Sequence, residues 1–196
     1  MTGVFICIEG LDGSGKSTQA KLLTKRLCKE GYNAIYTTEP SKEKIGQFIR
    51  KRLFEQERMP VSVEALLFAA DRIDHIQRDI APALQENKII ISDRYVYSSL
   101  AYQGSAGLSL DWIETINTNA QKPDLSIFID VPPEVVLKRI KRKKSVMENL
   151  STQKRVQEIY QKYVEKGSLK RIDGSKDKNE VLEELYTEVI CYLKKN

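Results

Sequence analysis

The chain has 196 residues, of which 41% are hydrophobic and 30% are charged, as expected for one folded domain with a buried core. No apolar run approaches the roughly 20 residues that cross a bilayer, and the start of the chain lacks the cationic segment of a signal peptide. The three cysteines, Cys7, Cys28 and Cys191, are too few and too widely spaced for a disulfide framework or a metal cluster. These features exclude a membrane-spanning or disulfide-stabilised protein and predict a cytoplasmic one with no membrane partner.

Much of the net charge of +5 comes from one basic segment, residues 138–144, with the sequence KRIKRKK. A basic segment can bind nucleic acid, form a solvated helix face or supply cations to phosphate groups. No aromatic residue is interleaved with these cations, as stacking on single-stranded nucleic acid would require. We therefore expect no nucleic-acid partner.

Apolar strands alternate with amphipathic helices along the chain. Strands are predicted at residues 4–9, 34–38, 88–92, 125–130 and 169–173. The first helix follows the first strand and stops near Gly31, whereas Ser41 and Ser62 are positioned to begin the next two. Pro82 should bend or end the third helix, and two later helices end near Gly167 and near the end of the chain. This alternation predicts an α/β fold with a parallel sheet covered on both faces.

The helix that Ser62 begins has a mixed composition. Its buried face is expected to carry Leu66, Ala69, Ala70 and Ile73. His75, the only histidine, lies in the polar stretch AADRIDHIQRD and has no cysteine or histidine partner for a metal. We predict that His75 is a surface residue.

A glycine-rich loop joins the first strand to the first helix, in the stretch EGLDGSGKSTQ. Its spacing, Gly-x-x-x-x-Gly-Lys-Ser over residues 10–17, is the phosphate-loop pattern in the strand–loop–helix setting that this motif requires. Glycines let backbone amides turn toward phosphate oxygens, and the start of the helix adds the positive end of its dipole. Lys16 is expected to reach the β and γ phosphates, and Ser17 to bind Mg²⁺. The predicted ATP-binding residues are Gly10, Leu11, Asp12, Gly13, Ser14, Gly15, Lys16, Ser17 and Thr18.

A second functional pattern, Asp93-Arg94-Tyr95, follows the strand at 88–92. It places a carboxylate and a guanidinium at the carboxyl end of a central strand, where ligands bind in open α/β sheets. Arg94 can clamp an acceptor phosphate through a fork of N–H donors, and Asp93 is a second candidate ligand for Mg²⁺. The chain lacks the Asn/Thr-Lys-x-Asp tetrapeptide of guanine-specific switch proteins and has no room for an effector domain. These observations favour a small kinase.

Five segments follow one another in a characteristic order. They are EGLDGSGKSTQ, TTEPS at 37–41, LLFAADR at 66–72, DRYVYSSLAYQG at 93–104 and KPDLSIFIDVPPEVVLKR at 122–139. Together they resemble the thymidylate kinase family over nearly the whole chain. The resemblance implies one domain, residues 1–196, with a P-loop NTPase-type three-layer α/β/α fold, a five-stranded parallel sheet and a short helical lid at about 139–151. It also implies transfer of the γ-phosphoryl group of ATP to dTMP with Mg²⁺, in a homodimer.

Phe68 and Arg72 are four residues apart on one predicted helix and therefore share a face. An aromatic ring can stack on a base, and a guanidinium one turn away can donate to a carbonyl at the base edge. The resemblance implies that these residues do this to thymine and its O4. Core packing is the alternative for Phe68, whereas an unpaired arginine is rarely buried.

The resemblance also assigns residues around the ring and sugar of the acceptor. Ser98 matches a position that bonds the pyrimidine ring, with Ser99 as the alternative. Tyr102 matches an aromatic residue that lies near the sugar and disfavours a 2′-hydroxyl, and Gln103 is expected beside it. Asp12 matches a carboxylate that holds the 3′-hydroxyl and helps to order the magnesium site. As alternatives, Tyr102 is a half-buried helix residue and Asp12 accepts hydrogen bonds within its loop.

Two other segments complete the predicted site. Glu39, in TTEPS, is expected to work with the water shell of the metal or with Arg94. Residues 173–176 follow the last strand, and in nucleotide kinases that loop lies against adenine. A helix-capping turn is the alternative for this loop.

The cation that meets the γ-phosphate is predicted to come from the lid. Gly13 and Ser14 stand where some family members carry a catalytic arginine, so the resemblance leaves Arg142 as the first choice and Arg139 as the second. The Asp-Arg-x-Glu pattern common in such lids is absent, and a solvated helix face is the alternative for this basic segment.

The predicted catalytic residues are therefore Asp12, Lys16, Arg94 and Arg142. Two rival functions stay open. One is another P-loop kinase that acts on a deoxynucleoside or a different monophosphate. The other is a non-catalytic ATP-dependent switch.

Overall fold

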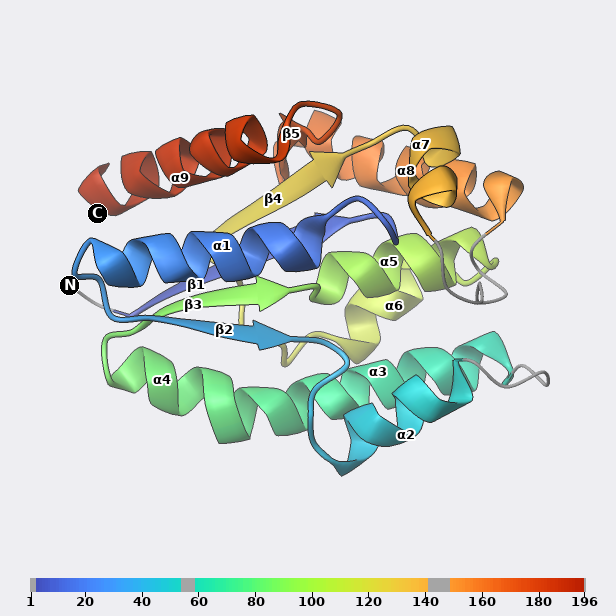
Figure 1. The fold of residues 1–196 in the computed structure, drawn as a ribbon. Helices are drawn as coiled ribbons and strands as arrows, with labels where there is room; N and C mark the ends of the chain where they lie inside the picture. Colours follow the sequence, from blue (N-terminus) through green and yellow to red (C-terminus); the bar gives the residue numbers. More distant parts are fainter. Residues whose placement is uncertain (1–2, 54–58, 141–148, 196) are drawn as a thin grey trace.

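The computed structural model describes residues 3–53, 59–140 and 149–195 (Figure 1). Five parallel strands form a sheet in the order β2-β3-β1-β4-β5, so the first strand of the chain lies at its centre. The strands are β1 (Val4–Gly10), β2 (Ala34–Thr38), β3 (Ile89–Asp93), β4 (Leu125–Asp130) and β5 (Lys170–Asp173). The predicted parallel sheet is confirmed, and each predicted strand is found within one residue of its expected bounds.

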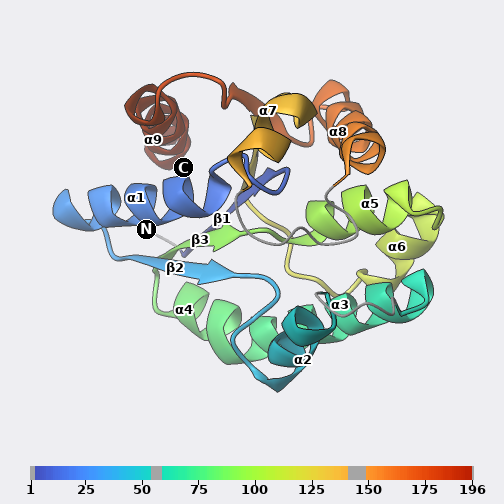
Figure 2. The same ribbon diagram turned by 45° about the vertical axis from the view of Figure 1, so that its right-hand side comes forward.

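Helices cover both faces of this sheet. In the described part of the chain they are α1 (Lys16–Lys29), α2 (Lys44–Arg52), α3 (Val61–His75), the π-helical turn η1 (Ile76–Ile80), α4 (Ala81–Gln85), α5 (Val96–Ser105), α6 (Leu110–Ile116), α7 (Pro133–Arg139), α8 (Leu150–Glu165) and α9 (Lys178–Lys195). Helices α1 and α9 lie on one face, and α3, α4 and α5 lie on the other (Figures 1 and 2). None of the described helices is long and apolar enough to cross a bilayer.

Alternate residues of β1 pack against the two helical layers. Ile8 belongs to the core cluster that contains Leu23 of α1, whereas Phe5 packs with Ile80 beneath the opposite face. All seven residues of β1 are buried, as expected for a central parallel strand covered on both sides. One of them, Glu9, is a carboxylate with no exposed surface.

The start of α2 differs from the prediction. Ser41 is not its N-cap, because α2 begins at Lys44 after Glu43. The backbone N–H and the hydroxyl of Ser41 both donate to the carboxylate of Asp71, at 2.7 and 2.6 Å. These two bonds to Asp71 of α3 fix Ser41 in the turn before α2. The hydroxyl oxygen of Ser41 there accepts from the Glu43 N–H.

The buried face of α3 also differs from the prediction. The helix begins at Val61 rather than at Ser62, and two residues of the expected apolar face, Leu66 and Ala70, are exposed. The buried charged residues of α3 are instead Glu64, Asp71, Arg72 and His75. The apolar spacing failed here because this helix packs against polar partners from the segment after β2 and from α5, so its charged side chains are buried with hydrogen-bond partners.

Removing the Phe5 ring is expected to cost about 3–5 kcal/mol of unfolding free energy, because a large buried aromatic leaves a cavity. Phe5 has no exposed surface, and its ring meets the Tyr95 ring edge-on at 4.9 Å. Urea denaturation of Phe5→Ala measures this loss. Leu150→Ala is the control, since Leu150 is 41% exposed and its truncation should change stability by only about 0.5 kcal/mol. Equal midpoints for the two variants would contradict the packing described here.

Candidate active site

The phosphate loop lies between the end of β1 at Gly10 and the start of α1 at Lys16. Gly15, the N-cap of α1, has a φ of 93°, and Gly13 has a φ of 88°, both in the left-handed region that favours glycine. A Cβ at Gly13 would also lie 2.8 Å from the Val136 carbonyl oxygen. The first amides of a helix have no partner inside it, so the loop presents them with the positive helix end. This is the backbone arrangement that phosphate binding requires.

Lys16 is buried inside this loop, with 5% of its surface exposed. Its Nζ donates to the Leu11 carbonyl oxygen at 3.3 Å and lies 3.7 Å from Asp12 Oδ1. Burial, together with the nearby charge of Arg94, lowers the pKa of the Lys16 ammonium below its ordinary value. The charge of the buried Lys16 ammonium would therefore be stabilised further only by another strongly negative group.

Arg94 follows β3 and reaches the same carboxylate. Its Nη2 donates to Asp12 Oδ1 at 2.6 Å, and its Nη1 donates to Ser98 Oγ at 2.9 Å. The backbone of Arg94 has a φ of 75°, which is uncommon for a residue with a side chain and frequent at functional sites. Burial disfavours the charge on Asp12, but Arg94 and Lys16 outweigh it and lower the pKa of its carboxyl below the usual range. Asp12 thus lies between two cations as a carboxylate.

A second buried ion pair joins the Glu39-Pro40 segment to α3. Glu39 Oε2 accepts from Nε and Nη2 of Arg72 at 2.9 and 2.7 Å, and Arg72 is only 1% exposed. Arg72 Nη1 also donates to Asn117 Oδ1 at 2.6 Å. The predicted partner of Glu39, Arg94, is bonded elsewhere, so that pairing is wrong, whereas the alternative role in a metal's water shell stays a prediction.

His75 belongs to the same cluster, so its predicted surface position is wrong. It has no exposed surface, and its Nδ1 lies 3.3 Å from Glu39 Oε1. Its Nε2 lies 2.5 Å from Thr37 Oγ1 on β2. The ring is buried because it supplies the second oxygen of the Glu39 carboxylate with a partner, and local polarity in the sequence carries no signal of that.

The remaining acceptor residues lie on α5 and α3. Tyr102 is 8% exposed, and its hydroxyl donates to Asp12 Oδ2 at 3.2 Å and accepts from the Asp12 N–H at 3.0 Å. Gln103 is buried and donates to Glu64 at 2.7 Å. Ser99 accepts from Arg72 at 3.2 Å, whereas Ser98 contacts Arg94. Phe68, one helical turn from Arg72, is half-buried. The structure therefore groups Ser99 with Arg72, and Ser98 and Tyr102 with Arg94.

The two predicted metal ligands fit a small hard cation. Ser17 is exposed at the first turn of α1, and Asp93 is 4% exposed at the end of β3. Asp93 Oδ1 is buried and has no hydrogen-bond partner among the described residues, while its Oδ2 accepts from the Tyr36 hydroxyl at 3.3 Å. Among the described residues, no group of three or more histidine, cysteine and acidic side chains could hold a metal ion, but Mg²⁺ needs only one or two carboxylates beside phosphates and water.

A cavity of about 210 Å³ opens beside the phosphate loop. Its lining residues are Ser14, Gly15, Thr18, Gln19, Arg139, Gly174, Lys176, Lys178 and Val181. It therefore brings the predicted adenine-facing loop and the second predicted lid cation, Arg139, next to the phosphate loop. Arg142, the first choice, lies outside the described residues, as does the rest of the lid between 141 and 148.

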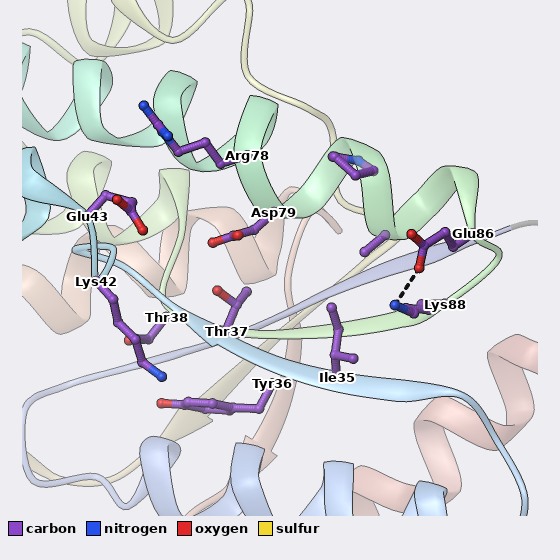
Figure 3. Close-up of a pocket in the computed structure, with 12 residues that line it drawn as sticks. Ile35, Tyr36, Thr37, Thr38, Lys42, Glu43, Arg78, Asp79, Glu86 and Lys88 are labelled. Atoms are coloured by element: carbon purple, nitrogen blue, oxygen red, sulfur yellow. Dashed lines mark ion pairs between the residues drawn. The ribbon is translucent and has the colours of Figure 1, made fainter.

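A larger cavity, of about 470 Å³, lies against the outer edge of β2 (Figure 3). Figure 3 shows Arg78 and Asp79 on its helical side and Ile35 and Tyr36 on the strand, with Glu86 and Lys88 joined by an ion pair. Both cations and carboxylates line it, and no predicted site residue does. The candidate active site is therefore the set of groups around Asp12, not this edge cavity.

The sequence interpretation missed three buried polar residues of the site. Glu9 contacts Ser98, Asn117 contacts Arg72, and Tyr160 contacts Glu9. Only Glu9 had a signal, because it is a lone carboxylate in the apolar run VFICIEG. Asn117 follows the end of α6 and Tyr160 lies on α8, both far away in sequence, and neither has a local pattern that points to the site.

Comparisons with known proteins agree with this geometry. The family model for thymidylate kinase matches residues 8–185. A probable thymidylate kinase of Pyrococcus horikoshii is 39% identical over 202 residues, covering 99% of this chain and 97% of that protein. One of Thermococcus gammatolerans is 45% identical over 174 residues, with 83% and 84% covered, and the thymidylate kinase of Halothermothrix orenii is 36% identical, with 96% and 97% covered. The chain belongs to the thymidylate kinase family.

Proposed function

We propose that this protein transfers the γ-phosphoryl group of ATP to dTMP, giving dTDP and ADP. One observation carries the proposal: the same oxygen, Asp12 Oδ1, lies 3.7 Å from Lys16 Nζ and 2.6 Å from Arg94 Nη2. Lys16 belongs to the loop for the donor phosphates, and Arg94 is the cation suited to an acceptor phosphate. Donor and acceptor phosphates bound to these two cations would meet at this point, as in-line transfer needs.

The donor side is built from the phosphate loop. Amides of residues 13–18 and the Lys16 ammonium bind the β and γ phosphates, and the base of ATP occupies the 210 Å³ cavity beside Arg139 and Lys176. Ser17 and Asp93 would hold Mg²⁺ together with phosphate oxygens and water. The bound metal supplies positive charge to the phosphate oxygens. Arg142 is retained as the further cation for the γ-phosphate.

The acceptor side positions dTMP against that loop. Arg94 clamps its phosphate, Asp12 accepts a hydrogen bond from the 3′-hydroxyl, and Tyr102 packs near the sugar. An oxygen of the acceptor phosphate, already anionic at neutral pH, forms a bond to the γ-phosphorus. The bond from that phosphorus to the β–γ bridging oxygen breaks, and the electron pair leaves with ADP. No general base is required, so the work of the protein is positioning and charge stabilisation.

We assign the base of dTMP to a position at α3. Phe68 stacks on thymine, and Arg72, fixed by Glu39 and Asn117, faces its O4. Ser99 is the better candidate for the bond to the pyrimidine ring, because it accepts a hydrogen bond from Arg72, whereas Ser98 accepts one from Arg94. Gln103, bonded to Glu64, closes the site on the α5 side.

The acceptor determines which kinase this is. We expect an assay of ADP release with ATP and Mg²⁺ to give fastest turnover with dTMP, among dTMP, dUMP, dCMP, dGMP and thymidine. Faster turnover with thymidine would indicate a nucleoside kinase, and ATP binding without acceptor-dependent turnover would indicate a switch. Either result would overturn the proposal.

We also propose a homodimer that forms through an exposed apolar surface on α2 and α3. Phe48, Val63 and Leu66 define this α2–α3 surface, and they are 47%, 43% and 50% exposed. Exposed apolar side chains on two helices that pack beside each other are typical of an interface.

The free cysteines Cys7 and Cys28 suit the reducing cytosol, where we place the reaction.

Leu66→Glu is expected to convert the dimer to a monomer, because it places a charge in the centre of the α2–α3 surface. Sedimentation velocity at micromolar concentration measures the mass of each species. The matched control is Leu150→Glu, since Leu150 is 41% exposed on α8, away from this surface. A parent protein that sediments as a monomer, or a Leu66→Glu variant that stays dimeric, would exclude this interface.

A further inference from the structure

Glu9 is a buried carboxylate to which the proposed mechanism assigns no role. It is the penultimate residue of β1 and has no exposed surface. Its Oε1 accepts from the backbone N–H groups of Tyr95 and Ser98, at 2.8 and 3.2 Å. Its Oε2 accepts from the hydroxyls of Ser98 and Tyr160, at 2.6 and 3.0 Å. Because burying a charge is costly unless it is fully bonded, this full set of donors indicates a defined role.

The Glu9 carboxylate controls the direction of the hydrogen bond between Ser98 and Arg94. A carboxylate can only accept, so the single hydroxyl proton of Ser98 is directed to Glu9. The Ser98 oxygen is then left with lone pairs, and it accepts from Arg94 Nη1 at 2.9 Å. Burial raises the pKa of the Glu9 carboxyl, while the Ser98 bond and the charge of Arg94 oppose that rise. The carboxylate and the guanidinium therefore stabilise each other through Ser98.

Tyr160 adds a second helix to this arrangement. Its hydroxyl lies 3.0 Å from Glu9 Oε2 and 3.1 Å from Ser98 Oγ. Its ring is fully buried and stacks on Phe128 of β4, with centroids 4.7 Å apart and planes at 16°. Phe128 is the register partner of Glu9 in the neighbouring strand, so both side chains point to the same face of the sheet. The sheet and α8 together place the tyrosine hydroxyl over the carboxylate.

We propose that Glu9 and Tyr160 are positioning residues that hold the Arg94 guanidinium, through Ser98, in the orientation that binds the acceptor phosphate. The inference rests on the proposed function, because it takes the acceptor to be a nucleoside monophosphate. One end of Arg94 is already fixed by Asp12 at 2.6 Å, and Ser98 fixes the other. Loss of the Ser98 link should therefore weaken phosphate binding and leave ATP binding unchanged.

The test compares two tyrosines of one helix. Tyr160→Phe removes the hydroxyl at Glu9, and Tyr163→Phe removes one that donates to Glu114 at 2.8 Å, away from Arg94. Tyr160→Phe should weaken dTMP binding about 2- to 10-fold, as expected for one hydrogen bond, whereas Tyr163→Phe should leave it within about twofold. Glu9→Gln should weaken it about 10- to 100-fold, because a charged acceptor is lost. Calorimetry gives the dTMP and ATP affinities, and thermal unfolding shows whether each variant is folded.

Two further measurements separate positioning from a merely structural role. Thymidine lacks the phosphate, so its affinity should be the same for Tyr160→Phe and the parent. The NMR signal of the Arg94 Nε–H should exchange faster in Tyr160→Phe than in Tyr163→Phe, without any substrate. Equal dTMP losses in both tyrosine variants, or an unchanged Arg94 signal, would overturn the inference. A parent that does not bind dTMP would overturn the proposed function instead, and the Arg94 signal would still decide the positioning role.

Discussion

Arg94→Lys is expected to lower kcat/KM for dTMP by about 100- to 1000-fold, while the KM for ATP changes little. The guanidinium is held at both ends, with Nη1 on Ser98 at 2.9 Å and Nη2 on Asp12 at 2.6 Å. Lysine keeps the positive charge, but one ammonium cannot reproduce a planar fork of donors. The loss should therefore appear in the kinetic constants for dTMP, since the fork of donors is what binds the phosphate of dTMP.

The measurement is ADP release with dTMP varied at saturating ATP. Arg78→Lys is the matched control, because Arg78 is an arginine whose side chain is 60% exposed and pairs with Asp74 on the surface. Its kinetics should equal those of the parent. An Arg94→Lys enzyme that behaved like Arg78→Lys would remove Arg94 from the acceptor site and would leave the proposed meeting of two phosphates without support.

Lys16→Met is expected to lower kcat by at least about 100-fold, because a preorganised cation at the transferring phosphoryl group is lost. Lys16 is buried, its Nζ lies 3.3 Å from the Leu11 oxygen, and methionine fills a similar volume. The structure of the loop should therefore persist while its charge is removed. Asp12 would keep Arg94 as its partner at 2.6 Å, so the acceptor side should lose much less affinity.

Single-turnover measurement with bound MgATP and dTMP isolates the transfer step. Lys21→Met is the control, since Lys21 is exposed on the same helix and its ammonium lies 5.3 Å from the centre of the Tyr36 ring. Comparable transfer rates in the two variants would show that the loop lysine has no part in the reaction.

Local signals in the sequence were enough for the sheet and the phosphate loop. The runs VFICIEG and LSIFID are mostly apolar, as is typical of central parallel strands, and the strands they form are buried in the sheet except for Leu125, which is partly exposed. Gly15 likewise has a left-handed φ, which glycine adopts without strain. The acceptor-site residues were predicted from the order of the five family segments along the chain. That order is characteristic of the family even where a single motif is ambiguous.

The same signals failed for α3. Leu66 and Ala70 have helical apolar spacing but are exposed, whereas Arg72 and His75 on the same helix are buried. Spacing identifies which residues share a face, but it does not say which face points inward when charged residues find partners there. Glu39, in the segment between β2 and α2, provides that partner for both.

The sequence by itself determined the strands, the glycine loop and the family, because these depend on apolar runs, on backbone freedom and on motif order along the chain. Only the tertiary structure decided how the cations of the site are oriented. Glu9 meets Tyr160 from 151 residues away, and Arg72 meets Asn117 from 45 residues away. The physical reason is that a buried charge is stable only where its hydrogen-bond partners converge, and that convergence is created by packing of distant helices on the sheet.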